Sequence, residues 1–397
     1  MNDILQREKI MTKVALAKCE NYDLVAVKEK IRDCLQYFGG IENLIQPQQK
    51  VFIKLNCVGA FPPEMAITTH PVFLEAVIEI VKERTERIIV GDNPATKDLV
   101  HTLKKCGLYE CIIKNSCQIL SGKELMTISN SNPKLYGNFE VSKEMFDVDV
   151  LINLPKLKTH SLTYMSVAEK NFFGVIYGLS KAGWHVRANN PLEFGEALND
   201  LYGAILESFE GKRIFHLCDG IIGLEGEGPS SGGSPRQAGA ILASNDAVSL
   251  DRVAVELCHL NYDKMFVTKI AGGRNYGEAD LSKIEICGES LENFQNVKFQ
   301  EPVNPTSSFG LKILRYRILR NLLLEHPRID TKLCIRCGEC VKICPPKTMK
   351  ISPHKYPELK PINCIRCWCC AEVCPQNAIK KTRRPLIGQI VFKNREK

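Results

Sequence analysis

Two copies of one cysteine pattern lie close together in the last third of the 397-residue chain. The pattern is Cys-x2-Cys-x2-Cys-x3-Cys-Pro, and it runs from Cys334 to Pro345 and again from Cys364 to Pro375. In a reducing compartment, cysteines are more often metal ligands or buried apolar residues than disulfides. Nine of the 18 cysteines fall between Cys334 and Cys374, and the other nine are scattered without ligand spacing. The repeated pattern therefore predicts a metal-binding unit.

The repeated pattern resembles that of the bacterial two-cluster 4Fe-4S ferredoxins over about 50 residues. In those proteins the first three thiolates of each run bind one cluster and the fourth binds the other cluster. The resemblance implies two 4Fe-4S clusters, with Cys334, Cys337, Cys340 and Cys374 as the ligands of cluster one and Cys364, Cys367, Cys370 and Cys344 as those of cluster two. A pair of zinc knuckles is disfavoured, because its ligands would have to close locally. Cys369 exceeds the eight expected ligands and is either a spare thiol or an alternative ligand.

The charge of the chain divides at the same place as the cysteines. Residues 309–397 contain 20 Lys and Arg against 6 Asp and Glu, a net charge of +14, which leaves −6 for residues 1–308. Residues 301–308 have the Pro and Ser content of a linker. We expect an α/β domain over residues 1–308, a basic connecting helix over 309–328, and a ferredoxin domain with a basic tail over 329–397.

The connecting helix is predicted from an apolar stripe. The stripe consists of Leu311, Leu314, Ile318, Leu322 and Glu325, with arginines to the side and Pro327 as the stop. A helix that packs the ferredoxin unit onto the large domain is the favoured interpretation, and a membrane-surface helix is the alternative.

The basic ferredoxin unit suits an acidic redox partner, such as a soluble ferredoxin or flavodoxin. Nucleic acid is disfavoured, because the basic cluster Lys380, Lys381, Arg383 and Arg384 has no interleaved aromatic residues. No apolar run approaches the roughly 20 residues of a membrane span, and the first residues do not have the pattern of a secretory signal. We therefore expect a cytoplasmic protein without a transmembrane segment.

Residues 13–300 alternate β-branched runs with helical stretches, which predicts an α/β fold with a mostly parallel sheet flanked by helices. The ferredoxin domain is expected to be a small α+β unit. Polar side chains follow five predicted strands: Lys54 and Asn56; Asp92 and Asn93; Lys156, Lys158, Thr159 and His160; Asp219; and Asp246. Because open α/β sheets bind ligands at the carboxyl ends of their strands, we expect one crevice there.

The segment from Lys156 to His160 is the strongest candidate for chemistry in that crevice. Two lysines and a histidine directly after an apolar strand suit an anion or a proton transfer, and Lys170 with Asn171 follows closely. Asp246 is more simply explained as a helix cap.

A glycine-rich loop over residues 223–235 contains Glu225, Gly226 and Gly228. It lacks the Lys-Ser/Thr of a phosphate-binding loop, and no dinucleotide-binding glycine motif follows the first strand. A mobile lid or a backbone cradle for an anion is the favoured interpretation, and a plain linker is the alternative.

These blocks together resemble the domain of unknown function 362 family, whose members often carry a fused ferredoxin unit. The blocks are Lys54-x-Asn56, Gly91-Asp92-Asn93-Pro94, Leu154 to His160, Lys170 to Gly174, Asp219 to Pro229, and Asp246-x4-Asp251. The resemblance implies a fold and a site without naming a reaction. The segment from the Lys-Thr-His block to Gly174 is also loosely similar to 2-hydroxy acid racemases that use a nickel pincer cofactor, although the several metal-binding histidines expected there are not evident.

Three functional hypotheses follow. In the first, electrons pass from the two clusters to an anionic small-molecule substrate, or to a further unidentified cofactor, in the crevice. Lys156, Lys158 and Lys170 would then hold the anion, and His160 or Asp219 would supply a proton. In the second, the protein is an electron-transfer or assembly subunit that docks a partner enzyme. In the third, it is a non-redox enzyme with structural clusters.

Overall fold

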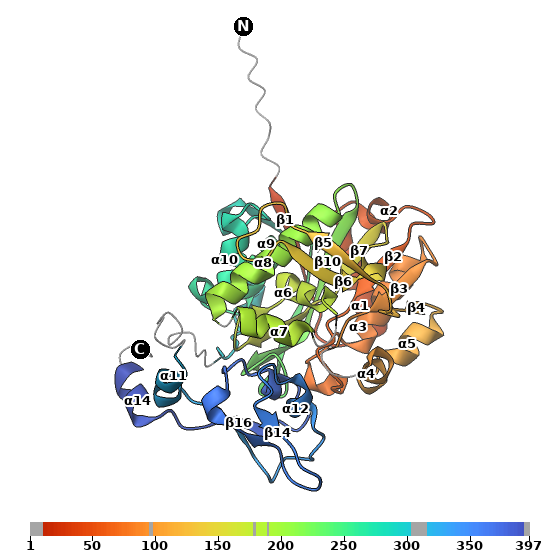
Figure 1. Ribbon diagram of the computed structural model, residues 1–397. Coiled ribbons are helices and arrows are strands. Elements are labelled where there is room, and N and C mark those ends of the chain that lie inside the picture. The colour runs from red at the N-terminus through yellow and green to blue at the C-terminus, as the bar shows by residue number, and fades with distance from the viewer. Residues whose placement is uncertain (1–10, 95–97, 178–179, 189, 303–315, 393–397) are drawn as a thin grey trace.

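The computed structural model describes residues 11–94, 98–177, 180–188, 190–302 and 316–392 (Figure 1). The described residues up to 302 form a large α/β unit, and a small cysteine-rich unit packs against one end of it. In the described ranges no helix is long and apolar enough to cross a bilayer.

One sheet forms the centre of the α/β unit, and within the described residues it has ten strands. Its main path runs β12-β1-β11-β10-β7-β2-β3-β4, and only β11 is antiparallel to its neighbours. The strands are β1 Thr12–Lys18, β2 Val51–Lys54, β3 Ile88–Gly91, β4 Gln118–Ile119, β7 Val150–Asn153, β10 Arg213–Gly226, β11 Gly233–Ser244 and β12 Ile284–Gly288. The prediction of a mostly parallel sheet is confirmed. Off this path, β8 (Lys156–His160) pairs with β10 and β9 (Tyr164–Ser166).

Helices cover both faces of the sheet (Figure 1). Val51 and Ile53 of β2 belong to one hydrophobic core and Phe52 to the other, because successive strand residues point to opposite faces. The first core is closed by α1 (Leu24–Gln36), α2 (Gly40–Leu44), α3 (Pro71–Lys82), α4 (Leu99–Lys105) and α5 (Tyr109–Lys114), and the second by α6 (Ala168–Asn171), α8 (Pro191–Ser208), α9 (Ala247–Leu257) and α10 (Phe266–Gly273). A separate hairpin, β5 (Leu125–Ser129) with β6 (Asn138–Ser142), lies beside α8. Asp246 caps α9 through the amides of Val248 and Ser249, as predicted.

The cysteine-rich unit has a repeated architecture. Its strands pair as β13 (Pro327–Ile329) with β16 (Ile379–Lys381) and as β14 (Met349–Lys350) with β15 (Glu358–Leu359). A short helix follows the second cysteine of each run, α12 (Glu339–Ile343) in the first and α13 (Cys369–Glu372) in the second. This arrangement confirms the expected small α+β unit.

The predicted connecting helix is only partly described, and its packing onto the large domain stays a prediction. Helix α11 (Arg317–Leu323) packs on α14 (Leu386–Phe392) inside the cysteine-rich unit, whereas Leu311 and Leu314 lie outside the described residues. Ile318 and Leu322 of the predicted stripe are 69% and 44% exposed, and the buried residues are Leu323 and Leu324.

Two polar contacts join the glycine-rich loop between β10 and β11 to the cysteine-rich unit. Ser231 Oγ donates a hydrogen bond of 2.7 Å to the carbonyl oxygen of Cys374, and Lys381 Nζ lies 2.6 Å from Glu227 Oε2. The loop therefore holds the two units together.

Candidate functional site

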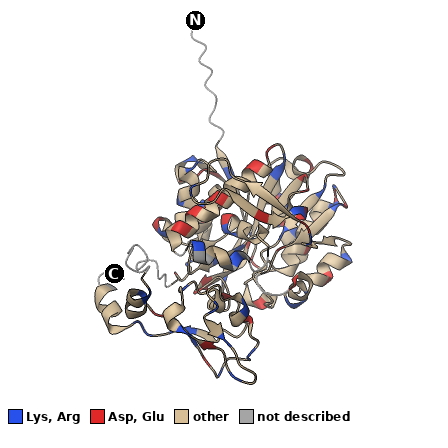
Figure 2. Cartoon of the chain, viewed as in Figure 1, with Lys and Arg blue, Asp and Glu red and all other residues tan. Residues whose placement is uncertain are grey.

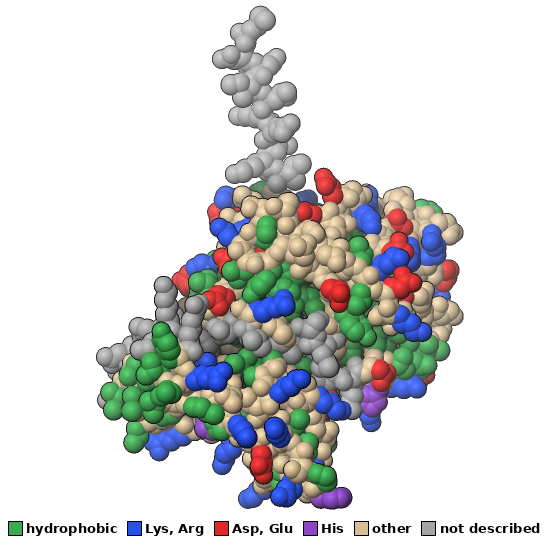
Figure 3. Space-filling model, in the orientation of Figure 1, with side chains coloured by type: hydrophobic (Ala, Val, Ile, Leu, Met, Phe, Trp, Pro, Cys, Tyr) green, Lys and Arg blue, Asp and Glu red, His purple; other side chains and the backbone are tan. Residues whose placement is uncertain are grey.

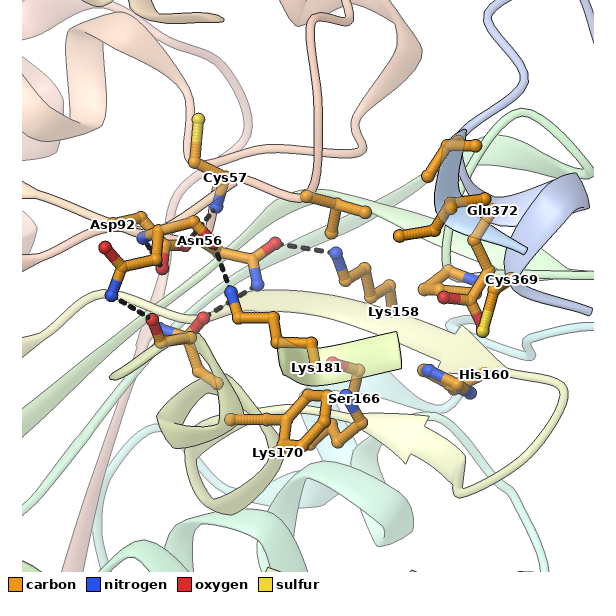
Figure 4. Close-up of a pocket in the computed structure, with 18 residues that line it drawn as sticks. Asn56, Cys57, Asp92, Lys158, His160, Ser166, Lys170, Lys181, Cys369 and Glu372 are labelled. Atoms are coloured by element: carbon orange, nitrogen blue, oxygen red, sulfur yellow. Dashed lines mark hydrogen bonds between the residues drawn. The ribbon is translucent and has the colours of Figure 1, made fainter. Parts of the chain in front are cut away.

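A cavity of about 90 Å³ lies where the α/β unit meets the cysteine-rich unit (Figure 4). The α/β unit lines it with residues after β2 and β3, on β8 and β9, and on the helices around α6, while helices α12 and α13 contribute from the cysteine-rich unit. The lining residues used below are Asn56, Cys57, Asp92, Asn93, Lys158, His160, Ser166, Lys170, Asn171, Phe173, Gly174, Lys181, Pro229, Ile343, Cys369, Glu372 and Val373.

Three lysines reach this cavity. Lys158 is fully buried, and its Nζ donates hydrogen bonds to Asn56 Oδ1 at 2.6 Å and to the carbonyl oxygen of Ile67 at 2.9 Å. Burial lowers the pKa of Lys158 to about 7, because an ammonium group loses its hydration there, and the nearby charge of Lys170 acts in the same direction. Burial also lowers the pKa values of Lys170 and Lys181 to about 8.

Glu372 is the carboxylate that faces these lysines from the cysteine-rich unit (Figure 4). Its Oε1 is buried and has no hydrogen-bond partner among the described residues. Burial raises the pKa of Glu372, and the charges of Lys170 and Lys158 oppose that rise. Glu372 therefore faces the amino groups of Lys158 and Lys170.

Asp92 does not balance the remaining positive charge, because Lys54 already pairs with it. Lys54 Nζ lies 2.8 Å from Asp92 Oδ1, and both side chains are buried. The amides of Cys57 and Asn93 donate to the same carboxylate at 2.7 and 2.8 Å. A Cβ at Gly174 would lie 2.2 Å from Asp92 Oδ1, so only glycine fits above the ion pair. The pair is a rigid part of the cavity wall.

Amide side chains extend this wall. Asn56 Nδ2 donates to Asn171 Oδ1 at 2.8 Å, and Asn171 Nδ2 donates to Asn153 Oδ1 at 2.7 Å. Asn93 Nδ2 donates to the carbonyl oxygen of Gly174 at 3.0 Å. These contacts hold Asn56, Asn93 and Asn171 in fixed orientations around the cavity.

His160 lines the cavity and is 2% exposed. Its Nδ1 accepts hydrogen bonds from the amides of Leu162 at 3.0 Å and Thr163 at 3.4 Å. In the neutral ring the proton therefore resides on Nε2, which makes that nitrogen the donor.

The structure places Lys156 and Asp219 in a second buried cluster, outside the cavity lining. Lys156 Nζ lies 2.8 Å from Asp219 Oδ2 and donates to the Tyr22 hydroxyl at 2.7 Å. That hydroxyl donates to Asp219 Oδ1 at 2.8 Å, and the amide of His70 donates to Oδ2 at 2.9 Å. Lys156 lies two residues before Lys158, about 6.6 Å back along the strand. Lys156, Lys158 and Asp219 therefore do not surround one ligand as expected. Lys158 lines the cavity, whereas Lys156 and Asp219 pair with each other outside it.

Thr159 and the glycine-rich loop also lie beside the cavity and not in its lining, except for Pro229. Thr159 Oγ1 donates to the carbonyl oxygen of Gly226 at 2.8 Å, and a Cβ at Gly228 would lie 2.0 Å from the carbonyl oxygen of Thr159. Glu225 Oε2 accepts from the amide of Gln300 at 2.7 Å. These contacts attach the loop to β8 and favour a connecting role over a mobile lid.

Sequence reasoning missed Lys181, Ser166, Cys369 and Glu372 as cavity residues. For the last two, a signal was present in the alignment of the two cysteine runs. Cys369 and Glu372 stand where the first run has Glu339 and Lys342, so only the second run places a thiol and a carboxylate at the cavity. No comparable motif marks Lys181.

The cysteine-rich unit has a donor set that fits 4Fe-4S clusters. Cys334, Cys337, Cys340 and Cys374 line one small cavity. Cys370 is half-buried, and its pKa is raised by desolvation and by the charges of the nearby Cys367, Cys364, Cys340 and Cys344. The residues at equivalent positions of both runs have positive φ angles: Arg336 60° and Gly338 79° in the first, Arg366 64° and Trp368 61° in the second. The two runs therefore wrap their thiols in the same backbone conformation.

Comparisons with known proteins match both units. The family model described as "Domain of unknown function (DUF362)" matches residues 51–256, and the model described as "4Fe-4S dicluster domain" matches residues 333–380. The second match supports 4Fe-4S clusters in the cysteine-rich unit. A curated relative, "Thylakoid-associated protein sll1697" of Synechocystis sp. (strain ATCC 27184 / PCC 6803 / Kazusa), is 31% identical over 251 residues, which are 62% of this chain and 75% of the relative.

Two solved structures are distantly similar. A protein from Thermotoga maritima matches with a TM-score of 0.37 and 12% identity, over 65% of this chain and 60% of that one. The lactate racemase apoprotein from Thermoanaerobacterium thermosaccharolyticum matches with a TM-score of 0.40 and 13% identity, over 64% of this chain and 58% of that one. The chain thus spans less than two thirds of the length of either solved chain.

Proposed function

Because the chain belongs to the domain of unknown function 362 family and carries a 4Fe-4S dicluster domain, we propose that it is an iron-sulfur oxidoreductase. Its reaction site is the cavity between the two units, and its substrate is a small anion held by Lys158, Lys170 and Lys181. Two 4Fe-4S clusters supply single electrons at the wall of that cavity when they are bound.

The observation that carries this proposal is the composition of the cavity wall. Cys369 and Glu372 line the cavity opposite the lysines, and Cys370, a proposed cluster ligand, is the next residue after Cys369. Neighbouring Cα atoms are about 3.8 Å apart, so the proposed ligand lies close to any molecule in the cavity. A docking subunit without its own chemistry would have no reason to place three lysines, one of them fully buried, beside such a ligand.

The size of the cavity restricts the substrate class. Pockets for drug-sized ligands measure about 300–1,000 Å³, whereas this cavity measures about 90 Å³. A nucleotide or flavin is therefore too large for it, and a small carboxylate or oxyanion is the better match. A substrate is thus favoured over a further cofactor in this cavity.

One group at the site can supply a proton to the reduced product, and another can donate a hydrogen bond to it. His160 in its neutral form presents its Nε2–H as a hydrogen-bond donor, because Nδ1 accepts backbone amides. Lys158 has its pKa lowered to about 7 by burial, so it gives up a proton far more readily than an ordinary lysine. Asp219 is no longer included in this role, since Lys156 and Tyr22 hold its carboxylate.

We further propose the cluster ligands that the ferredoxin pattern implies, with Cys369 as a thiol of the cavity wall and not as a ligand. Cluster one is held by Cys334, Cys337, Cys340 and Cys374, and cluster two by Cys364, Cys367, Cys370 and Cys344. The ferredoxin domain spans residues 329–397, and the α/β domain ends near residue 308. The reducing cytoplasm would keep the nine other cysteines as thiols.

An acidic electron carrier is the partner that this arrangement suits. Cys337 is the exposed cysteine of the first run, and Lys332, Arg336 and Lys355 of the same unit are also exposed. Lys and Arg are spread over the ribbon of this unit (Figure 2). Electrons from a reduced carrier would therefore arrive at cluster one, and cluster two adjoins the cavity.

Electron paramagnetic resonance of the reduced, iron-loaded full chain tests the site. The probes are acetate, oxalate, phosphate and sulfite, titrated anaerobically into wild-type protein and Lys158→Met protein. The proposal predicts that at least one probe changes the cluster spectrum with saturation in the wild type and requires a much higher concentration in the variant. Spectra that no probe alters, or that change identically in both proteins, would contradict it.

A further inference from the structure

Helices α11 and α14 expose a continuous set of apolar side chains at the outer end of the cysteine-rich unit (Figure 3). The exposed residues and their exposed fractions are Tyr316 69%, Ile318 69%, Leu322 44%, Leu386 74%, Ile387 53%, Ile390 76% and Val391 48%. We call this surface the α11–α14 face. Single exposed apolar residues are ordinary, but a contiguous set of this kind marks an interaction surface.

The two helices are held firmly from their inner side. Leu323 and Leu324 are buried, and a Cβ at Gly388 would lie only 1.9 Å from the carbonyl oxygen of Leu323, so glycine permits the close approach of α14 to α11. Arg384 Nε also lies 3.0 Å from Glu325 Oε2. The apolar face is therefore part of a packed pair of helices whose interior is already filled.

The segments that form the face are rich in basic residues. Residues 316–328 and 380–391 contain seven Lys and Arg against a single acidic residue, Glu325. Lys381 and Arg384 pair with Glu227 and Glu325, whereas Arg317, Arg328 and Arg383 are exposed. Apolar side chains that enter the headgroup region, together with cations that meet anionic headgroups, are the combination by which proteins bind the surface of a bilayer.

We propose that the α11–α14 face docks the protein peripherally on a membrane surface that contains anionic lipids. Exposed cations beside an apolar face match the anionic headgroups and the apolar interior of a bilayer, and this combination favours a lipid surface as the occupant. The docking leaves the cavity between the units untouched, so this proposal does not depend on the proposed reaction.

Vesicle sedimentation with the iron-loaded full chain tests the proposal. Vesicles of phosphatidylcholine with phosphatidylglycerol should bind the protein, and added salt or omission of phosphatidylglycerol should weaken that binding. The double variant Leu386→Ser/Ile390→Ser should lower the partition coefficient by at least about tenfold, since each buried apolar side chain contributes about that factor or more. The matched control is Val25→Ser/Leu192→Ser on the α/β unit, where the residues are 73% and 54% exposed. This control should bind like the wild type.

Four outcomes would overturn the proposal. The wild type could fail to bind the anionic vesicles, or the control could lose binding as strongly as the α11–α14 variant. Sedimentation velocity without vesicles could show a wild-type dimer that the α11–α14 variant dissociates, in which case a second copy covers the face. A fall of several degrees in the melting temperature of the α11–α14 variant, but not of the control, would mean that a segment of the same chain covers it.

Discussion

Lys158 of the α/β unit and Glu372 of the cysteine-rich unit face the same cavity, and each favours the charged form of the other. The pairing crosses the boundary between the two units. A small anion that entered the cavity would meet the three lysines together with this carboxylate. Anion binding and the charge of Glu372 in the cysteine-rich unit are therefore electrostatically linked.

Replacing Lys158 by Met should weaken anion binding without unfolding the protein. A hydrogen bond from a charged group contributes about 1.5–3 kcal/mol, which corresponds to a roughly 10- to 150-fold loss of affinity. The burial cost that lowers the pKa of this lysine disappears in the variant and offsets the loss of the bonds to Asn56 and Ile67. Calorimetric titration with the probe that binds the wild type measures the effect, and equal affinities would show that Lys158 does not hold the anion.

Replacing Lys156 by Met should instead lower the stability of the protein, and it should not weaken anion binding directly. It leaves Asp219 buried without its cation, which costs about 3–5 kcal/mol in the free energy of unfolding. The double variant Lys156→Met/Asp219→Asn should recover part of that loss. Denaturant unfolding of the two single variants and the double variant measures the coupling, and a single variant as stable as the wild type would contradict the structural role given to this pair.

Anion affinity should fall as the pH rises from about 7 to 9. The pKa of Lys158 is lowered to about 7 and those of Lys170 and Lys181 to about 8, so the ligand-free lysines lose protons in this range. A bound anion favours their charged forms, and binding near pH 8 should therefore take up protons. Calorimetry in buffers of different ionisation enthalpy measures the uptake, and binding without any proton uptake at pH 8 would count against the three lysines as ligands.

The same lowered pKa values predict how stability depends on pH. Between the folded value of about 7 and the ordinary value of 10.5, the unfolded chain binds a proton that folded Lys158 does not. The contribution of Lys158 to the free energy of unfolding should therefore increase with pH across this window. The free energies of unfolding of the wild type and the Lys158→Met protein, measured at pH 7 and pH 9, isolate this contribution. A difference between the two proteins that is the same at both pH values would contradict the prediction.

Replacing Cys369 by Ser should leave about eight iron atoms per chain, because two clusters use eight other thiolates. Replacing the neighbouring Cys370 by Ser serves as the matched variant, and it should lower the iron content and alter the spectrum of one cluster. Iron analysis of both proteins decides the assignment. A loss of iron from the Cys369→Ser protein equal to that from the Cys370→Ser protein would make Cys369 a ligand.

The fold and the cysteine-rich unit could be predicted because their signals are local. The strand alternation of Val51, Phe52 and Ile53 and the cap at Asp246 follow from residues next to one another in the chain. The spacing of the cysteines likewise lies within two short runs. The family resemblance is confirmed by the matches over residues 51–256 and 333–380.

Which residues line the cavity could not be predicted, because it depends on distances between side chains that are far apart in the sequence. Lys156 and Lys158 share one motif, yet Lys156 meets Asp219 and Tyr22 while Lys158 meets Asn56. Glu372 lies more than 200 residues from Lys158 in the chain, and only the packing of the two units brings them to one cavity. In the described part of the connecting helix, Ile318 and Leu322 of the predicted stripe are exposed, while Leu323 and Leu324 are buried.

The central claim is that a small anion in the cavity accepts electrons from the cysteine-rich unit. Stopped-flow absorbance measures it most directly. Iron-loaded wild type and Lys158→Met proteins are reduced anaerobically and freed of reductant. Each protein is then mixed with small anions that can accept electrons, including sulfite and small carbonyl acids. At least one probe should reoxidise the wild type with saturating kinetics and the Lys158→Met protein at least about tenfold more slowly. If a probe binds in the cavity by calorimetry but neither protein is reoxidised, or both are reoxidised at the same rate, the cavity is not the site of electron transfer.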